Sequence, residues 1–594
     1  MNRDCKSAAT IDMHLGLKTI IGLLLALVFP IAAVANDNKV KFSHSGGFYE
    51  QSFALSLTCQ DGYTIHYTTN GNEPKWTDPQ YQSPLWLDEK LFSNSKIYTI
   101  QTCSDELWYV PDKIQQCIVI RAAAFEEEGH RVGETVTNSF FINALGCKDN
   151  EIPIVSLCVD SVSLFDYDSG IMVGGATGTN YFQTGRDWER LCNVEYYKSD
   201  NEDCINQMAG LRLHGHGARV GMQKGFKLYA RKEYGKKRFH NRFFEDTDLT
   251  SFKHLVLKPV GGGMIRDHIS SEIARPLHFE KTASRMVILF LNGEYWGPYY
   301  LKERPDDHFI ADHCGHDNQD VNIIESWSGD IANGNNEQFL EMMRWVAQAD
   351  FTDDEQYAKA CSIIDVDCFI DYYCFQLFVS NADWPDNNMR CWQANDGKWR
   401  WIFYDGDYCL ADYRPMLSST LYNKENKDVS TFLFTKLLQN EHFRDSFYKR
   451  YGTLLTHEFD SKETMPRFNA SMEDINKVIQ DHFHRFGMLN YDSDFDFEIR
   501  FIEQFLSIRM VSAAAMIYQL YYYNGWEYHL SENRKQVKFS YDPTSRRPTF
   551  LFRMARQFKD WRYVSMYFSY RRHCIIQSFK NSNFYRKLKQ WKHR

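Results

Sequence analysis

The sequence predicts an α+β protein in which a small antiparallel β-sandwich precedes a larger two-lobed domain. Two observations support this architecture. Short β-type runs separated by turn residues fill residues 40–143, whereas residues 150–525 mix both types of element, with strands first and helices dominating later. The chain has 594 residues, more than one hydrophobic core usually supports, so two or more domains are expected.

The N-terminus has the pattern of a secretory signal. Lys18 precedes the apolar run TIIGLLLALVFPIAAVA, and Ala33-Val34-Ala35 provides the small residues of a cleavage site. The run is short for a membrane span, and no later run is long and apolar enough for one. We therefore expect residues 1–35 to be removed and the protein to be exported, to the periplasm, the cell surface or the medium, without a transmembrane helix.

Charge is distributed unevenly along the chain. The formal net charge is −9, but residues 531–594 carry 17 Lys and Arg against 3 Asp and Glu, so the body is strongly acidic. An acidic body argues against nucleic-acid binding. The basic, aromatic-rich tail, residues 526–594, could meet a membrane surface, an acidic partner or the body itself. Of 15 cysteines, 14 lie beyond the signal at irregular spacings, so no disulfide pairing is assigned.

Residues 40–143 read as a β-sandwich of about 100 residues. The segment YTTNGNEPKWTDPQYQSPLWL resembles the chitobiase C-terminal-type module, whose turn typically reads Y-T-x-D-G-T-x-P; Asn70 stands here at the usual Asp. Such modules accompany secreted carbohydrate-related or surface proteins. The resemblance implies a spacer, with glycan or cell-surface contact as the alternative.

Residues 150–525 contain the predicted elements of the larger domain. Strand candidates are IPIVSLCV, GLRLHG, GFKLYAR, RMVILFLNG, WGPYYLKE and WRWIFYD. Helix candidates are MIRDHISSEIARPL, NNEQFLEMMRWVAQ, CFIDYYCFQLFVS and FEIRFIEQFLSIRMVSAAAMIYQLYYY. The hairpin LNG between two of these strands is a strong turn signal.

The stretch NADWPDNN, residues 381–388, places two carboxylates and three amides between segments that look buried. Asp383 and Asn388 lie five positions apart, and the strand that follows delivers Asp405 and Asp407 in FYDGD. Protein kinases order their chemistry in the same way, with a catalytic Asp, an Asn five residues later and a metal-binding Asp after a strand. Hard oxygen ligands of this kind suit Mg²⁺.

Upstream segments provide the other parts of such a site in a suitable order. The stretch GLRLHGHGARVGMQKGFKLYARKEYG reads as strand, glycine-containing turn and strand, with Lys224 and Lys227 on the second strand. The helix that follows offers Glu272 as a partner for a strand lysine. A later strand ends at Glu303 and Arg304, where a hinge between lobes is expected.

These segments together resemble the CotH kinase family, named for spore-coat protein H, over residues 205–510. The resemblance rests on LRLHGHGAR, QKGFKLYARKEYG, MIRD, LNGEYWGPYYLKER, NADWPDNN and GKWRWIFYDGD in that order. With the chitobiase-type module, the chain looks like the exported form of Bacteroidetes-type bacteria. The sequence DGDYCLADY departs from the family by lacking the Gly of D-x-D-F-G, and HGHGAR replaces a turn richer in Ser and Asn.

The resemblance implies a role for each candidate residue. Asp383 would be the catalytic Asp. Asn388, Asp405 and Asp407 would form the metal site. The remaining candidates would contact ATP or support the residues that do: Lys224 as the first choice, Lys227 as the second, then Arg212, Glu272 and Glu303.

Structural alternatives exist for several of these residues. Asn381, Asp386 and Asn387 suit the turn itself, as Asp and Asn do beside Pro. Lys224 and Lys227 could be solvated charges at a strand edge. His214 and His216 share one face of a strand, but no third zinc ligand has a suitable spacing.

The sequence therefore predicts an exported atypical protein kinase-like enzyme that moves the γ-phosphoryl of ATP, with Mg²⁺, to Ser or Thr hydroxyls of an unidentified protein. The alternative is a catalytically inactive kinase-like scaffold for surface adhesion. A third possibility is a carbohydrate-associated accessory protein acting through the N-terminal module.

Overall fold

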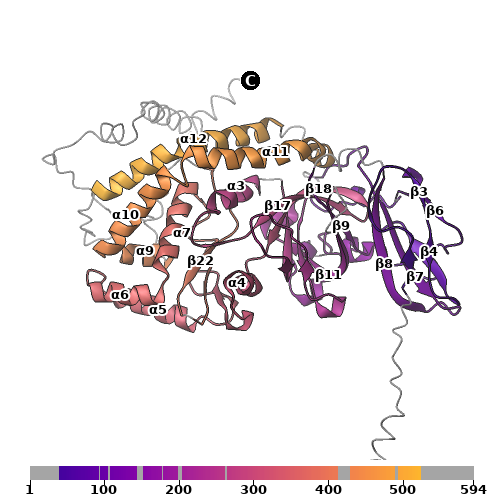
Figure 1. Ribbon diagram of the computed structural model, residues 1–594, viewed down its shortest axis with the longest axis horizontal. Coiled ribbons are helices and arrows are strands. Elements are labelled where there is room, and N and C mark those ends of the chain that lie inside the picture. Colours follow the sequence, from indigo (N-terminus) through magenta and orange to yellow (C-terminus); the bar gives the residue numbers. More distant parts are fainter. Residues whose placement is uncertain are drawn as a thin grey trace, which may run out of the picture.

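The computed structural model describes residues 39–92, 94–104, 108–142, 151–176, 178–198, 204–260, 264–395, 397–411, 429–487 and 492–522. The predicted signal (residues 1–35) and the basic tail (residues 526–594) lie outside these residues. Within them, no helix is long and apolar enough to cross a bilayer. A β-module, a β-barrel and a mainly helical part follow one another across the molecule (Figure 1).

The N-terminal module consists of three small sheets around one apolar core. Its strands are β1 (Lys41–Phe42), β2 (Gly47–Tyr49), β3 (Phe53–Leu55), β4 (Leu57–Thr58), β5 (Thr64–Thr68), β6 (Leu85–Leu87), β7 (Ile118–Phe125) and β8 (Arg131–Ile142). The larger sheet has the order β2-β8-β7-β5, and β1-β4 and β3-β6 form two-stranded sheets. The β2–β8 pair is parallel, which departs from the antiparallel sandwich that we expected.

The middle of the chain closes into a seven-stranded barrel. Its strands are β9 (Ile154–Cys158), β10 (Arg190–Tyr197), β11 (Ile205–His214), β12 (Gly225–Tyr229), β15 (His254–Pro259), β17 (Ser284–Leu291) and β18 (Glu294–Glu303), in the order β10-β11-β12-β15-β18-β17-β9. Apolar side chains at alternate positions fill the interior, among them Leu211, Phe226 and Leu257. The residues between them therefore point outward. The predicted Asn292-Gly293 turn joins β17 to β18 with positive φ at both residues.

The second part of the larger domain packs helices on a five-stranded sheet of order β16-β22-β21-β19-β20. These strands are β16 (Glu280–Lys281), β19 (Asn322–Ile324), β20 (Ile331–Asn333), β21 (Cys391–Gln393) and β22 (Arg400–Phe403). The helices are α3 (Met264–Ala274), α4 (Asp307–Cys314), α5 (Glu337–Gln348), α6 (Asp354–Ile363), α7 (Val366–Val379), α9 (Phe432–Leu437), α10 (Glu441–Thr456), α11 (Ser461–Phe486) and α12 (Asp492–Tyr522). Outside the sheets lie α2 (Ser161–Phe165) and the short pair β13 (Phe239–His240) and β14 (Ser251–Phe252).

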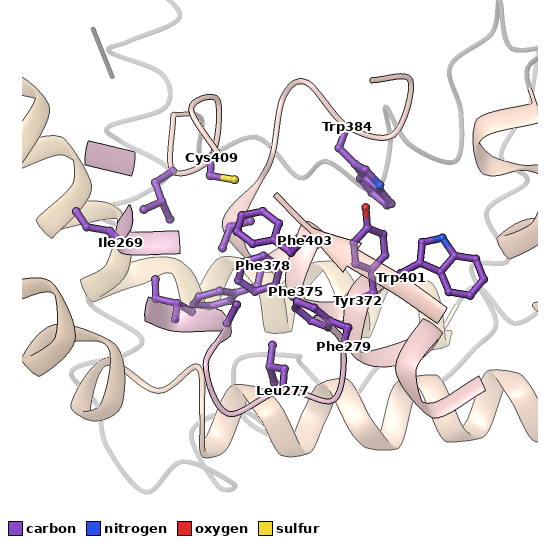
Figure 2. Close-up of a cluster of buried hydrophobic side chains, with 14 of the residues drawn as sticks. Ile269, Leu277, Phe279, Tyr372, Phe375, Phe378, Trp384, Trp401, Phe403 and Cys409 are labelled. Atoms are coloured by element: carbon purple, nitrogen blue, oxygen red, sulfur yellow. The ribbon is translucent and has the colours of Figure 1, made fainter. Parts of the chain in front are cut away.

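Helix α7 is the centre of the helical part. Nearly all of its side chains are buried, as expected for a helix that is apolar on every face. Asp365 caps its N-terminus by accepting a hydrogen bond from the Cys368 backbone N–H at 3.1 Å. Figure 2 shows Phe375 and Phe378 of α7 beside Phe403 of β22, and the Phe375 and Phe403 rings lie 4.7 Å apart. Helices α11 and α12 run side by side along one edge (Figure 1).

The N-terminal module is docked on the barrel by buried carboxylates. Glu195 of β10 accepts hydrogen bonds from the Ser139 backbone N–H of β8 at 3.1 Å and from the Tyr197 hydroxyl at 2.6 Å. Glu294 of β18 accepts hydrogen bonds from two successive backbone N–H groups, those of Ile97 and Tyr98, each at 2.9 Å. Both carboxylates are fully buried. The module and the barrel therefore pack as one body, more closely than a simple spacer requires.

Glu195 makes the stability of this junction depend on pH. Burial raises the pKa of its carboxyl from 4.5 to about 7, although hydrogen bonds from Ser139 and Tyr197 oppose the shift. A raised pKa means that the protonated form is favoured on folding, so the stabilisation is complete below about pH 4.5 and is lost as pH rises through about 7.

We predict that Glu195→Gln removes this pH dependence, because the amide is neutral at every pH. Relative to the variant, the wild type should lose about 2 to 3 kcal/mol of unfolding free energy between pH 5 and pH 8. Denaturant unfolding of both proteins at the two pH values gives this difference. An equal pH response in both proteins would contradict the assignment.

Candidate functional site

The polar loop after α7 is held in place by an apolar anchor and by side-chain hydrogen bonds. Trp384 is buried against Tyr372 (Figure 2) and Tyr373, and its ring centroid lies 4.8 Å from that of Tyr373. Asn381, also buried, donates to the Gln376 side chain at 3.0 Å and accepts from the Asp383 backbone N–H at 3.2 Å. These contacts offset the cost of placing so many polar groups between buried elements.

The structure brings Asp383, Asn388 and Asp405 together. The Asn388 side-chain amide donates to Asp383 Oδ2 at 2.9 Å and to the Asp405 backbone carbonyl at 3.3 Å. Asn387 donates to the same Asp383 oxygen at 3.0 Å. Asn388 and Asp405 have φ values of +53° and +59°, in the left-handed region that Asn and Asp tolerate better than most residues. The Asn388 amide thus connects the loop after α7 to the segment after β22.

Two backbone hydrogen bonds align those segments further. The Ala382 N–H donates to the Tyr408 carbonyl at 3.2 Å, and the Leu410 N–H donates to the Val379 carbonyl at 2.7 Å. Asp386 faces away from this pairing and accepts from the Ser430 hydroxyl at 2.7 Å. Asp383 and Asp405 are therefore fixed relative to each other by main-chain as well as side-chain contacts.

A buried lysine of the barrel completes the cluster. Lys258, on the outer face of β15, places its Nζ 2.7 Å from Asp405, 2.8 Å from Asp407 and 3.1 Å from Asp267 of α3. Asp267 is also paired with Lys302 of β18, at 2.5 Å, and accepts from the Gly406 backbone N–H at 2.8 Å. The barrel, α3 and the segment after β22 thus meet at one ammonium.

Comparison with protein families matches residues 211–512 to the CotH kinase protein family. This match covers half of the chain. The chain belongs to the CotH kinase family. Residues 44–137 match the chitobiase/beta-hexosaminidase C-terminal domain, in the order that the sequence predicted. Both expected resemblances are thereby confirmed.

No curated protein matches this CotH family member. Solved structures that are similar to parts of it include the following two. One is the HipA–HipB toxin–antitoxin complex of Shewanella oneidensis MR-1 with its operator DNA, at 12% identity and a TM-score of 0.24, covering 50% of this chain and 65% of that chain. The other is the proinflammatory kinase CtkA of Helicobacter pylori, at 11% identity and a TM-score of 0.21, covering 50% of this chain and 92% of that chain. Both superpositions are poor, and neither places a residue of this chain.

The charges of this CotH-family site perturb one another strongly. Burial would raise the Asp267 pKa, but Lys258 and Lys302 outweigh burial and hold it well below its ordinary value. Burial would lower the Lys258 pKa, but Asp267 and the other carboxylates raise it well above its ordinary value. Burial raises the pKa of Asp407 to about 7, helped by Asp267 and Asp405 and opposed by Lys258.

A row of cationic side chains lies on the same outer face of the barrel. Cross-strand pairing joins Arg212 to Lys227 and Lys227 to Val256, which in turn pairs with Lys302. Paired residues point to one face of a sheet, and Lys258 shares that face because it lies two positions after Val256. The outer surface of β11, β12, β15 and β18 is therefore basic where it meets the carboxylates.

Lys227 differs from the other lysines of this face. In the described part of the chain no carboxylate pairs with its ammonium. Burial lowers its pKa to about 8, and the positive charges of Arg304, Arg219 and Arg390 add to the effect. Among the described residues, the buried Nδ1 atom of the nearby His214 has no hydrogen-bond partner. Burial lowers the pKa of that ring well below its ordinary value, and the positive charge of Lys227 lowers it further. An unneutralised cation beside an unsatisfied ring nitrogen suits an anionic ligand.

The structure places the other predicted residues away from the carboxylates. Lys224 donates to the Arg219 carbonyl at 2.5 Å and to the Gly221 carbonyl at 2.9 Å, so its ammonium is occupied by the glycine-containing turn. Arg212 is paired with the buried carboxylate of Glu189 at 2.7 Å. Neither residue is in contact with Asp405. The lysine that contacts Asp405 is Lys258, which the sequence did not predict.

Glu272 and Glu303 also lie elsewhere. Glu272 pairs with Arg275, the residue that follows the end of α3, and Glu303 contacts His313 Nε2 at 2.8 Å. Both line a separate cavity of about 240 Å³. Asp267, and not the predicted Glu272, is therefore the α3 carboxylate that pairs with a strand lysine. The lone charge within the apolar run LVLKPV was the signal that could have identified Lys258, whereas Asp267 stands between Arg266 and His268 in MIRDHI and had no comparable signal.

The donor set fits Mg²⁺ that arrives with a phosphate. The described residues contain no cluster of three or more His, Cys, Asp or Glu side chains arranged to hold a metal, which removes support for a zinc site at His214 and His216. Mg²⁺ commonly needs only one or two carboxylates besides phosphate oxygens and water. The Asp405 side chain is 43% exposed and the Asp407 side chain 18% exposed, so both are within reach of such an ion.

We predict that Lys258→Met lowers the free energy of unfolding by about 3 to 5 kcal/mol, because it leaves buried carboxylates without a counter-charge. Adding Asp267→Asn to that variant should recover part of the loss. Lys224→Met is the matched control: it removes a buried ammonium that binds two backbone carbonyls and the face of the Tyr181 ring but, among the described residues, no carboxylate, so a loss of about 1 to 3 kcal/mol is expected. Chemical denaturation of the wild type, these three variants and Asp267→Asn alone measures these values; simple additivity of Lys258→Met and Asp267→Asn would refute the coupling.

Proposed function

We propose that this chain is an atypical protein kinase-like enzyme that transfers the γ-phosphoryl group of ATP to a Ser or Thr hydroxyl of a protein, with Mg²⁺. The observation that carries the proposal is the convergence of Asp383, Asn388 and Asp405 opposite Lys258. Kinases combine such a loop with a lysine of the barrel-like lobe that is ion-paired to a helix carboxylate. Here Lys258 and Asp267 form that pair.

Asp383 would orient the acceptor hydroxyl and take its proton as the oxygen bonds to the γ-phosphorus. The bond from that phosphorus to the β–γ bridging oxygen breaks, and ADP leaves. Asn388 holds the Asp383 carboxylate at 2.9 Å, which fixes the direction of proton transfer. Mg²⁺, when bound, neutralises phosphate charge and would be held by Asp405 and Asp407, with Asn388 nearby. Lys258, Lys302 and Lys227, on the outer face of the barrel, would offset the negative charge of the phosphates.

The proposal extends to location and partners. Residues 1–35 would be a cleaved signal, residues 40–143 the module and residues 150–525 the two-lobed kinase-like domain, in an exported protein of Bacteroidetes-type bacteria. Residues 526–594 would form a separate basic tail. The module would bring the enzyme to a glycan or another cell-surface component, and the acceptor is a protein.

An inactive kinase-like scaffold is the second candidate. One observation favours it: the Lys258 ammonium already lies among the three carboxylates Asp267, Asp405 and Asp407, so the site is neutralised without a metal. Calorimetric titration with Mg²⁺-ATP separates the two candidates. Binding in the micromolar range supports the enzyme, and the absence of heat supports the scaffold.

We predict that Asp383→Ala lowers the phosphorylation rate by about 10² to 10⁴-fold, because the acceptor loses its general base and its orientation. Asp405→Ala should reduce both turnover and Mg²⁺ dependence. Asp386→Ala is the control on the same loop, since its carboxylate contacts only Ser430 among the described residues, and it should retain activity within about threefold. Radiolabel transfer to protein measures these rates. Full activity in Asp383→Ala would sink the mechanism.

We also predict that Mg²⁺-ATP binds more weakly as pH rises through about 8, because the free Lys227 ammonium, which attracts phosphate, loses its proton there. The dissociation constant should rise about tenfold between pH 7.5 and pH 9. Lys227→Met should bind weakly at both pH values and show a flat profile. Lys224 also has a pKa lowered by burial to about 8, so Lys224→Met is the control and should keep the wild-type slope. Calorimetry at each pH gives the profile, and a slope that follows Lys224 would reject the role of Lys227.

A further inference from the structure

Helix α12 places a buried guanidinium at the end of α7. Arg509 is 1% exposed, and its Nε donates to the Phe378 carbonyl at 2.7 Å while one terminal nitrogen donates to the Leu377 carbonyl at 2.6 Å. The other terminal nitrogen lies 3.4 Å from the Ser512 hydroxyl. One arginine therefore binds two successive carbonyl groups of the last turn of α7.

Those carbonyls are where a helix needs a partner. The last four C=O groups of a helix have no intrahelical donor, and a buried one is costly if it stays unpaired. A cation at this end also interacts favourably with the helix dipole. Arg509 meets both requirements, because its planar guanidinium donates to two acceptors at once.

The turn that Arg509 binds leads directly into the proposed catalytic loop. Ser380 follows with a φ of +52° and Asn381 is bonded back to Gln376, so α7 ends within two residues of Leu377 and Phe378. The Asn381 side chain then accepts from the Asp383 N–H at 3.2 Å. Arg509 thus binds the last turn of α7, and that turn in turn holds Asn381 of the loop that carries Asp383.

The segment that carries Asp405 is hydrogen-bonded to the same turn of α7. The Val379 carbonyl, next to the two that Arg509 binds, accepts from the Leu410 N–H at 2.7 Å. Helix α12 has a second connection to this segment: Glu498 pairs with Arg266 of α3 at 2.9 Å, and Arg266 donates to the Cys409 carbonyl at 3.3 Å. Helix α12 therefore contacts both supports of the site.

We propose that Arg509 is a positioning residue for the phosphoryl-transfer site, which it serves by fixing the last turn of α7 and so the Asp383 loop. This inference rests on the proposed function for its kinetic consequence only. The structural consequence is that Arg509 keeps the Asp383 loop ordered, and this holds whether or not the protein hydrolyses or transfers phosphate from ATP.

The test compares Arg509→Met with Arg450→Met in the full chain. Arg450 of α10 also anchors α7, through a two-point contact with the buried Asp371 at 2.6 and 2.9 Å, but that contact lies two turns before the loop. A general weakening of α7 would affect both variants. Loss of positioning would affect only Arg509→Met.

The first readout is amide hydrogen exchange without nucleotide. In Arg509→Met, exchange of peptides spanning 379–390 and 404–411 should accelerate at least about tenfold, while barrel peptides stay unchanged. Arg450→Met should leave those loop peptides near the wild-type rate. Unchanged loop exchange in Arg509→Met, or an equal increase in both variants, overturns the proposal.

The second readout is kinetic. Arg509→Met should lower kcat on the order of 10²-fold, with the KM for Mg²⁺-ATP within about threefold, because the loop is misplaced while the basic face of the barrel is intact. Arg509→Lys, which keeps one donor at the turn, should recover part of the rate. If the wild type lacks activity, the proposed function fails and the exchange result still decides the positioning. If Arg509→Met does not fold, Arg509→Lys takes its place in the exchange comparison, and a wild-type profile in that variant rejects the proposal.

Discussion

The burial of one positive charge constrains the rest of the site. Lys258 follows three apolar residues of β15, and the cost of burying its ammonium is offset by the three carboxylates that surround it. Asp267 arrives on α3, and Asp405 and Asp407 arrive on the segment after β22. A single ammonium thereby sets the distance between the barrel, a helix and the loop that carries the proposed metal ligands.

The surroundings of helix α7 offset a different cost, the free energy of placing a loop rich in polar side chains beside an apolar core. The helix is buried on all sides and ends at a turn whose carbonyls are satisfied by Arg509 and by Leu410. Trp384 then inserts an apolar side chain from within the polar loop itself, so that the loop is held by packing at one position and by hydrogen bonds at the others. Asp383 can remain partly exposed on a support that is rigid.

The N-terminal module shows how a small β-domain becomes part of a larger one. A spacer would contact its neighbour weakly, whereas Glu195 and Glu294 of the barrel are fully buried and bind backbone N–H groups of the preceding segment. Buried carboxylates of this kind would be costly without those donors, so the barrel strands depend on the module for satisfied hydrogen bonds. A ligand that binds the module would therefore act on a body continuous with the barrel.

The sequence predicted the type of the elements that it identified, because hydrophobic periodicity and turn residues act locally, but it did not single out β10 and β15 of the barrel or the helices α10 and α11. It also predicted that Asp383, Asn388 and Asp405 belong to one site, since a loop after a buried helix and the end of a later strand carry them in the order that protein kinases use. Only the tertiary structure decided which cations face them. Lys224 and Lys258 both lie in strand-like runs. In the barrel, Lys224 binds the turn before β12, whereas Lys258 on the neighbouring β15 faces the carboxylates. Likewise Glu272 and Asp267 lie five residues apart on α3, about 140° around the helix, and only its packing decides which carboxylate faces the lysines. Charge pairs of this kind join residues distant in sequence, so no local pattern can specify them.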